Sequence, residues 1–272
     1  MAEEKKRLDL LLVERNFYPT REKAQAAIMA GLIMVGEQKV EKAGTKVEIQ
    51  SSIRILGNLC PYVSRGGLKL AKALNSFSIS LENKMVLDVG ASTGGFTDCA
   101  LQNGARKVYA IDVGYGQLAW SLRQDPRVVN LERTNIRHLT LEQLGEKGDL
   151  ATIDVSFISL DKVLPTVKDL LMEQGEIITL VKPQFEAGKE NIGKKGVVKD
   201  PKVHRQVLDK VIQLAQAIGL VIRGLTFSPV KGPEGNIEFL LFLSKDLTIE
   251  GVGNLTELVE KTIEESKQLT NN

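Results

Sequence analysis

Four ionisable side chains stand at the ends of apolar runs or beside glycines, where a buried core would not ordinarily place a charge. They are Lys69, Asp154, Lys182 and Glu238. Lys182 ends an apolar run and precedes a proline, which is a costly position for an ammonium group unless carboxylates lie close by. A lysine in such a position need not be a permanent free base, but it can hold a hydroxyl group in line and take up its proton as the oxygen attacks. Together the four residues predict such chemistry, although each one alone could equally close a sheet edge through an ion pair.

The segments around these residues predict a parallel sheet, because apolar runs alternate with amphipathic stretches. The strand-like runs are 84–89, 107–112, 128–131, 150–153 and 177–181, and the helical stretches lie at about 96–103, 116–123, 160–172 and 203–218. Such alternation is typical of an α/β fold with helices on both faces of the sheet. Two further runs, 220–227 and 237–243, predict an antiparallel hairpin, and a last helix is expected at about 254–268.

The predicted sheet brings the four side chains to one edge. Asp154 and Lys182 follow the fourth and fifth strands, and Glu238 lies at the start of the last strand. An antiparallel strand begins at the edge where parallel strands finish, so these side chains are expected to face the ligand crevice. Lys69, in the segment that opens the large domain, is expected to face the same crevice.

Two glycine-rich turns follow strands and could hold an anionic or ribose-bearing ligand on open backbone N–H groups. The first spans 88–97. The second, 114–119, satisfies the dinucleotide pattern G-x-G-x-x-A and has Glu132 further along, so that alone it would predict NAD and a dehydrogenase. The place of the first turn in the predicted fold favours it as the ligand-binding turn, because it follows the first long strand of the alternating region. Asp112 then ends the next strand, where an acidic residue can accept both ribose hydroxyls.

The spacing of the first turn favours S-adenosylmethionine over a dinucleotide. Its D-x-G-x-x-x-G-G pattern lacks the spacing that cradles a pyrophosphate, and the sulfonium nucleoside carries no phosphate. Both interpretations remain open at this point, with a methyltransferase preferred to a dehydrogenase. Asn135 either contacts the adenine or forms a plain turn. The residues expected to bind the cofactor are Asp88, Gly90, Ser92, Gly94, Gly95, Phe96, Asp112 and Asn135.

Residues 5–56 have a pattern of their own, in which two short helices precede small strands. Thr20 starts the second helix and Gly31 ends it. The motifs Arg7-Leu8-Asp9 and Thr20-Arg21 resemble the RNA-binding domain first seen in ribosomal small-subunit protein four. The resemblance implies a small α+β domain whose basic side chains contact RNA, with a solvated charged surface as the alternative. The expected RNA contacts are Arg7, Arg15, Arg21, Lys23, Lys39, Lys42 and Arg65.

The full set of motifs is similar to the TlyA family, ribosomal RNA 2′-O-methyltransferases often labelled haemolysin A. The matching stretches are SRGGLKL, DVGASTGGFT, DVSFISL, VKPQFE and GPEGNIEF. The resemblance implies a large domain of the FtsJ type, a Rossmann-like methyltransferase sheet of seven strands with an antiparallel last strand. It also implies a Lys-Asp-Lys-Glu catalytic tetrad, in which Asp154 and Glu238 position Lys182 while Lys69 stabilises the developing alkoxide. Thr93 stands where the FtsJ loop usually has proline.

Charge is unevenly distributed along the 272 residues. The formal net charge is +2, but the first 72 residues carry 13 basic and 8 acidic side chains, which leaves the remainder weakly acidic. The split favours a cationic RNA-docking module joined to a catalytic domain. We expect a small RNA-binding domain at 5–60, a linker at 61–65, the methyltransferase domain at 66–246 and a C-terminal helical tail at 247–272.

Composition excludes several other classes. A hydrophobic fraction of 43% is enough for a core, and no apolar run approaches the roughly 18–20 residues that cross a bilayer. The two cysteines form no Cys/His cluster, which argues against a disulfide scaffold or a zinc site. We therefore expect a cytoplasmic enzyme without a metal, whose partners are ribosomal RNA or ribosomal subunits and not a membrane. A non-catalytic RNA-binding or ribosome-assembly factor and a membrane-active haemolysin are the alternatives, and the oligomeric state is left open.

Overall fold

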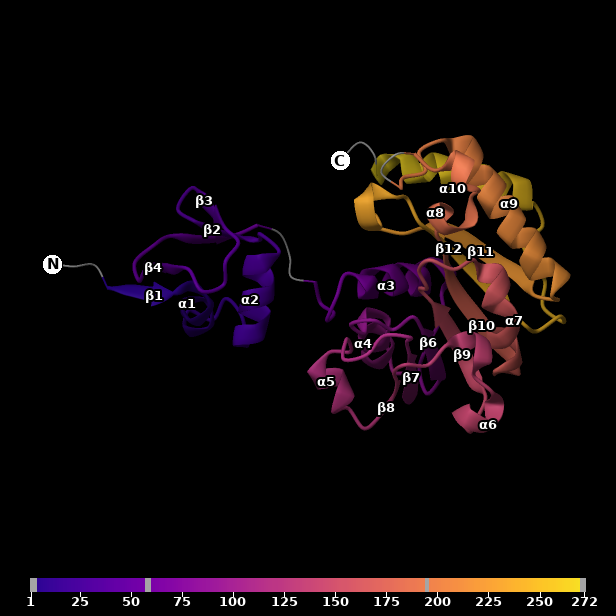
Figure 1. The fold of residues 1–272 in the computed structure, drawn as a ribbon, viewed down its shortest axis with the longest axis horizontal. Helices are drawn as coiled ribbons and strands as arrows, with labels where there is room; N and C mark the ends of the chain where they lie inside the picture. The colour runs from indigo at the N-terminus through magenta and orange to yellow at the C-terminus, as the bar shows by residue number, and fades with distance from the viewer. Residues whose placement is uncertain (1–3, 57–59, 194–195, 270–272) are drawn as a thin grey trace. The chain divides into compact units, whose positions relative to one another are not determined.

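The computed structural model describes residues 4–56, 60–193 and 196–269, and the chain divides into two compact units, Met1–Cys60 and Pro61–Asn272 (Figure 1). The first unit packs around one hydrophobic core and the second around two. Within the described ranges, no helix has the length and apolar character needed to span a bilayer. The two units are described separately below.

The first unit combines two helices with two small antiparallel sheets. Its elements are β1 (Lys5–Arg7), α1 (Leu8–Glu14), α2 (Arg21–Met29), β2 (Ile33–Val35), β3 (Gln38–Val40), β4 (Lys46–Glu48) and β5 (Ile53–Ile55). β1 pairs with β4, and β2 lies between β3 and β5. Thr20 caps α2 by accepting a hydrogen bond from the backbone N of Lys23, and Gly31, with φ of +67°, follows the last turn. Both ends of this helix lie where the sequence predicts them.

The second unit is built on a seven-stranded sheet, which confirms the predicted fold class. The strands are β6 (Met85–Val89), β7 (Lys107–Ile111), β8 (Val128–Leu131), β9 (Gly148–Ile153), β10 (Leu171–Val181), β11 (Val221–Phe227) and β12 (Phe239–Ser244). Their order is β11-β12-β10-β9-β6-β7-β8. β12 runs antiparallel to both of its neighbours, and the other pairs are parallel. The carboxyl ends of the parallel strands therefore share one edge with the start of β12.

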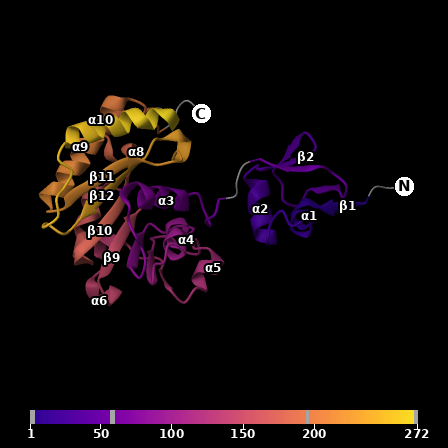
Figure 2. The same ribbon diagram turned by 180° about the vertical axis from the view of Figure 1, so that it is seen from behind.

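Helices cover both faces of this sheet (Figure 2). They are α3 (Gly66–Phe77), α4 (Gly95–Gln102), α5 (Trp120–Arg123), α6 (Leu141–Leu144), α7 (Leu164–Asp169), α8 (Pro183–Glu186), α9 (Pro201–Ala217) and α10 (Leu255–Ser266), with 3₁₀ turns η1 (Ile136–His138), η2 (Leu160–Lys162), η3 (Lys189–Asn191), η4 (Pro233–Gly235) and η5 (Lys267–Leu269). One core packs α7, α9 and α10 on one face, and the other packs α3 and α4 on the opposite face. Neighbouring residues of β6, Val86 and Leu87, enter different cores, as expected for a strand covered on both sides.

Several elements differ from the sequence prediction, each for a local reason. The sequence predicts no helix at 66–77, because a glycine pair opens α3 and resembles a linker. The expected helix 116–123 is reduced to α5, since Gly116 has φ of +73° and begins no helical turn. The expected helix 160–172 becomes η2 and α7, and Leu171 already pairs with β9 as part of β10. β12 begins at Phe239, so Glu238 directly precedes the strand and does not open it.

Candidate active site

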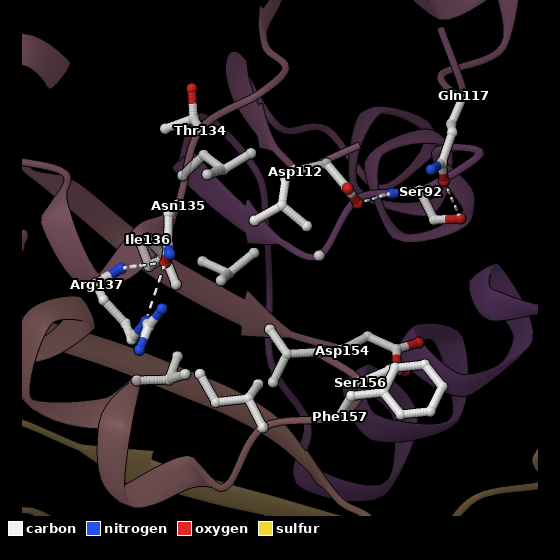
Figure 3. A pocket seen from close by; sticks show the side chains of 17 residues that line it. Ser92, Asp112, Gln117, Thr134, Asn135, Ile136, Arg137, Asp154, Ser156 and Phe157 are labelled. Carbon is white, nitrogen blue, oxygen red and sulfur yellow. Dashed lines mark hydrogen bonds between the residues drawn. The ribbon is translucent and has the colours of Figure 1, made fainter. Parts of the chain in front are cut away.

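A cavity of about 610 Å³ opens at the carboxyl edge of the sheet in the second unit (Figure 3). The stretches 89–92, 111–113, 134–137 and 154–158 supply most of its lining. These stretches follow β6, β7, β8 and β9. The cavity thus lies where open α/β sheets bind their ligands, beyond the carboxyl ends of the strands.

The turn after β6 has a backbone that only glycine fits at one position. Gly90 has φ of +87°, and a Cβ there would lie 2.6 Å from the backbone oxygen of Asp154. Ser92 follows with φ of +49°, and its backbone N donates to Oδ2 of Asp112 at 2.7 Å. The turn is therefore held between the end of β7 and the loop after β9, with Gly90 and Ser92 facing the cavity.

Asp88 supports this turn from beneath. It is buried, and its two oxygens accept from Thr97 Oγ1 at 2.6 Å and Thr152 Oγ1 at 3.1 Å. Burial raises the pKa of Asp88 to about 6, while the two threonine hydroxyls act in the opposite direction. Three further residues predicted to bind the cofactor, Gly94, Gly95 and Phe96, are buried at the start of α4 and do not line the cavity. Of the predicted cofactor residues, those that line it are Gly90, Ser92, Asp112 and Asn135.

Asp112 is held by two backbone N–H groups. Its Oδ2 accepts from Ser92, and its Oδ1 accepts from Gly114 N at 2.7 Å. Figure 3 shows the carboxylate at the cavity wall, directed toward Ser92. Each oxygen keeps a further lone pair, so a fixed carboxylate of this kind suits a ligand that presents two adjacent hydroxyls, such as a ribose.

The second glycine-rich turn is occupied by its own contacts. Glu132, the acid that a dinucleotide site would need for the ribose, accepts from Gly116 N at 2.8 Å and pairs with Arg123. The helix that follows, α5, has only four residues. This geometry favours the turn after β6 as the nucleoside site and leaves the NAD interpretation without its ribose acceptor.

Asn135 combines the two roles considered for it. Its Oδ1 accepts from the backbone N of Arg137 at 3.1 Å and caps η1, as a turn residue would. It also lines the cavity beside Thr134 and Ile136 (Figure 3). Its side-chain amide N–H groups remain donors at a wall that could receive a base.

The four ionisable residues form one chain of contacts; Asp154 lines the cavity, whereas Lys69, Lys182 and Glu238 are not among its lining residues. Lys182 Nζ lies 2.6 Å from Asp154 Oδ1, and Lys69 Nζ lies 3.6 Å from Asp154 Oδ2. Lys69 Nζ donates to Glu238 Oε2 at 2.6 Å. The side chains are 8%, 19%, 11% and 0% exposed for Lys182, Asp154, Lys69 and Glu238, so water screens these contacts little.

The partner of Glu238 differs from the expectation. The resemblance implies that Glu238 positions Lys182, whereas its carboxylate contacts Lys69. Its second oxygen, Oε1, is buried without a hydrogen-bond partner in the part of the chain that the structure describes. A Cβ at Gly232 would meet that oxygen, so a larger residue in this turn would require the Glu238 carboxylate to shift. Asp154 is therefore the residue that links the two lysines.

Sequence reasoning overlooks two residues of the loop after β9. Ser156 Oγ accepts from Lys182 Nζ at 3.1 Å. Phe157 is 91% exposed with φ of +62°, and its ring centroid lies 5.0 Å from that of Phe185. Their segment, DVSFISL, is visible in the sequence, but no charge or spacing distinguishes this serine or phenylalanine from ordinary loop residues.

In the first unit, a buried carboxylate gathers two of the predicted RNA-binding arginines. Asp9 is 0% exposed and accepts from Arg7 Nε and Nη2, at 3.0 and 2.8 Å, from Arg21 Nε at 2.9 Å and from Gln25 Nε2 at 2.7 Å. The hydrogen bonds from Arg7 are the main reason why the pKa of Asp9 lies far below its ordinary value. The two guanidinium groups are thus fixed next to each other while remaining 40% and 47% exposed.

The other predicted RNA contacts have different surroundings. Arg15 donates to the backbone oxygens of Ile49 and Ser51 and so supports the fold of the first unit. Lys39 lies 3.3 Å from Glu41. Lys23 and Lys42 are exposed, and Arg65 is exposed at the start of α3 in the second unit.

The sheet order, with an antiparallel strand beside the fifth strand, gives the second unit the Rossmann-like fold that is also seen in a solved structure of a putative S-adenosylmethionine-dependent methyltransferase from Listeria monocytogenes. The particular group follows from the sequence. Residues 62–245 match the FtsJ-like methyltransferase family and residues 6–53 match the S4 domain, so the chain belongs to the FtsJ-like methyltransferases and, within them, to the TlyA proteins. S-adenosylmethionine is the methyl donor of this class.

Relatives cover nearly the whole chain. The "Putative rRNA methyltransferase YqxC" of Bacillus subtilis is 51% identical, with 98% of each chain covered. The "16S/23S rRNA (cytidine-2′-O)-methyltransferase TlyA" of Mycobacterium tuberculosis is 43% identical over 95% of this chain and 97% of its own. A solved structure, "Putative hemolysin from Streptococcus thermophilus", superposes with a TM-score of 0.78 at 41% identity and covers 99% of this chain and 98% of its own.

Proposed function

We propose that this protein transfers a methyl group from S-adenosylmethionine to a ribose 2′-hydroxyl of ribosomal RNA. The observation that carries the proposal is the chain of contacts from Lys182 through Asp154 and Lys69 to Glu238, beside a nucleoside-sized cavity. A set of four charges drawn from separate segments and meeting at a ligand crevice favours an enzyme over a non-catalytic assembly factor.

The cavity fits the methyl donor. Asp112 would accept the ribose hydroxyls, the Gly90–Ser92 turn would allow close approach to backbone, and Asn135 would contact the adenine. S-adenosylmethionine supplies an electrophilic methyl group whose departure leaves a neutral sulfide, so the transfer needs no metal. Among the described residues, no cluster of His, Cys, Asp or Glu suits a metal ion.

The catalytic residues act on the incoming hydroxyl. Lys182, acting through the free lone pair of its neutral amine, would orient the 2′-hydroxyl and take up its proton as the oxygen attacks, which leaves the ammonium form after the transfer. Asp154 Oδ1 and Ser156 Oγ lie 2.6 and 3.1 Å from Lys182 Nζ and hold it in place. Lys69, fixed by Glu238, would stabilise the negative charge that develops on the oxygen.

The substrate class rests on the relatives and on the first unit. The relative from Mycobacterium tuberculosis is named for 16S and 23S rRNA and for the cytidine 2′-oxygen. The S4 match in the first unit, with the paired guanidinium groups of Arg7 and Arg21, supports binding of a phosphate backbone. We therefore propose ribosomal RNA or ribosomal subunits as partners and the cytoplasm as the place of action.

The proposal is tested by transfer of labelled methyl from S-adenosylmethionine to ribosomal subunits and to naked rRNA. We expect label in alkali-resistant dinucleotides, since a 2′-O-methyl group prevents cleavage of the adjacent phosphodiester. Label on a base or on protein, or none with either substrate, would contradict the proposal.

Asp112→Ala is expected to weaken binding of S-adenosylmethionine by about 30-fold or more, because two hydrogen bonds to a charged acceptor disappear. The measurement is the Kd by isothermal titration calorimetry. Asp125→Ala is the control, since Asp125, like Asp112, accepts from a backbone N–H, that of Arg127, but it precedes β8 and so lies at the opposite edge of the sheet. An unchanged Kd for Asp112→Ala would remove this residue from the cofactor site.

Asp9→Asn is expected to weaken RNA binding by about threefold to tenfold, although it removes a negative charge from a surface that binds a polyanion. The reason is that Asp9 fixes Arg7 and Arg21. Glu37→Gln is the control, because the side chain of Glu37 is 90% exposed and its pair with Arg54, at 3.4 Å, lies on the surface, where such a pair contributes little beyond its charge. Tighter RNA binding by both variants in fluorescence anisotropy would contradict the positioning role.

The stability of Asp9→Asn is expected to depend on pH differently from that of the parent protein. Because the folded-state pKa of Asp9 is depressed, its stabilising effect is present above its ordinary value of 3.8 and is lost as the pH falls below it. We expect the parent protein to lose stability in the first unit under these acidic conditions, and Asp9→Asn to lack this loss.

A further inference from the structure

Glu186, four residues after Lys182, is a buried carboxylate that the proposed chemistry does not use. Its side chain is 2% exposed at the end of α8. Oε1 accepts from the backbone N of Leu160 at 2.7 Å, and Oε2 accepts from Ser159 Oγ at 2.6 Å. Lys210 of α9 lies 3.6 Å from Oε2 and donates to the backbone oxygen of Glu186 at 3.0 Å. Both carboxylate oxygens therefore bind the loop that follows β9.

Glu186 caps the start of η2, a role that the side chain of the N-cap residue usually fills. Ser159 is the N-cap residue of η2, but its side chain makes no capping hydrogen bond. Its hydroxyl donates to Glu186 instead, and the other oxygen of Glu186 accepts the N–H of Leu160, the first residue of the turn. A charged acceptor at the start of a helical turn makes a stronger hydrogen bond than a neutral one. Glu186 thus fixes the start of η2 from a segment 26 residues away in sequence.

The loop between β9 and η2 is held at both ends and carries functional groups between them. At its start, the backbone N of Asp154 donates to Val89 of the neighbouring strand at 2.9 Å. At the end of the loop, Ser159 and Leu160 donate hydrogen bonds to Glu186. Between these anchors lies Ser156, whose hydroxyl accepts from Lys182. Lys182 and Glu186 flank α8, so this one short helix contacts the loop on both sides of its exposed part.

The exposed part of the loop has a strained backbone. Phe157 adopts φ of +62°, a left-handed conformation that a large side chain rarely takes. The residue is 91% exposed and lines the cavity, and its ring contacts Phe185 of α8. A strained conformation persists only where surrounding contacts hold it. With so little of Phe157 buried, the anchors of the loop must supply most of that restraint.

We propose that Glu186 is a positioning residue for methyl transfer. By anchoring the loop 155–160, it keeps Ser156 on Lys182 and keeps the exposed ring of Phe157 at the mouth of the cavity, where the acceptor nucleotide must enter. Glu186 acts through the loop and is placed away from the reacting atoms. The inference rests on the proposed role of Lys182.

The test compares Glu186→Ala with Glu186→Gln in the full chain, by kcat and KM for subunit methylation. Alanine removes the anchor, and we expect kcat to fall by about 30-fold, within the range that misplacement of catalytic groups produces. Glutamine can still accept from Leu160 N and donate to Ser159 Oγ, so its kcat should stay within about threefold of the parent. The KM for S-adenosylmethionine should change less than kcat in the alanine variant.

Asp149→Ala is the matched control. Asp149 accepts from a backbone N–H, that of Met85, at 2.7 Å, but at the opposite edge of the sheet. We expect it to lower the unfolding midpoint as Glu186→Ala does, with kcat unchanged. An equal loss of kcat in Asp149→Ala and Glu186→Ala, an inactive glutamine variant, or a fully active alanine variant would each overturn the positioning role. Absence of ribose label with the parent protein would overturn the proposed function itself, and a fully active Lys182→Met variant would overturn the role of Lys182 on which the inference rests, so these failures are distinguishable from that of Glu186.

Discussion

Lys182→Met is expected to reduce the rate of methyl transfer by about 10³-fold, the range that loss of a general base produces. Methionine preserves the length of the buried side chain but can neither hold the 2′-hydroxyl nor take its proton. The contacts of Lys182 are with Asp154 and Ser156, and none of the residues that would hold the adenosine depends on its ammonium group. We therefore expect the Kd for S-adenosylmethionine to change little. Single-turnover methylation of ribosomal subunits measures the rate of methyl transfer, and calorimetry measures the Kd for S-adenosylmethionine.

A matched control for this variant exists in the same sheet. Lys84 also forms a close lysine–carboxylate pair, with Glu176 at 2.6 Å, but it lies away from the cavity. Lys84→Met should keep full activity and at most lower stability slightly. If Lys182→Met retained the activity of Lys84→Met, the catalytic assignment would be wrong, whatever its effect on stability.

Removal of residues 1–60 is expected to weaken RNA binding by about 100-fold at moderate salt, because the S4 domain, with the paired guanidinium groups of Arg7 and Arg21, is removed. Binding of S-adenosylmethionine should persist, since every residue that lines the cavity belongs to the second unit. The two hydrophobic cores of that unit contain only its own residues, so the truncated chain is expected to fold. RNA affinity across a salt series and the Kd for S-adenosylmethionine are the two measurements.

The salt series provides the internal control for the truncation. Loss of phosphate contacts must reduce the slope of log K against log salt concentration, whereas a misfolded second unit would lose both ligands without this signature. Equal loss of both affinities would argue against a modular protein. Unchanged RNA affinity would show that the second unit alone binds the substrate.

The sheet could be predicted from sequence because its central strands are apolar runs buried on both faces. The start of β10 could not, since Glu173, Gln174 and Gly175 resemble a turn and yet lie inside the strand, where the pairing with β9 is irregular. α3 was equally hidden, because Gly66 and Gly67 are poor helix formers. The space for a Cβ at Gly67 is taken by Tyr62, and Gly95 of α4 lies against the backbone of Gly67, so packing and not helix propensity accounts for these glycines. Prediction from local helix and strand propensity failed at these segments because tertiary packing determines their secondary structure.

The same limit applies to the site. The edge position of Lys69, Asp154, Lys182 and Glu238 follows from strand order, but which carboxylate pairs with which lysine depends on side-chain directions that no pattern encodes. Asp88 belongs to the same motif as Gly90, yet its carboxylate is buried and accepts from Thr97 and Thr152, and the spacing of the motif does not reveal those two partners. Glu186 gives no signal in sequence, since an exposed glutamate at the end of a short helix would look identical.

The place of β12 in the sheet determines when the enzyme can become active during synthesis. β11 joins the sheet only through β12, which comes later in the chain and inserts between β11 and β10. Until residues 239–244 have left the ribosome, β10 has a free edge and β11 has no strand to pair with. Glu238, the partner of Lys69, arrives with the same segment. Closure of the sheet and completion of the proposed catalytic cluster are therefore expected in one late folding event, and a nascent chain that stops before it lacks Glu238 and exposes the edge of β10 to aggregation.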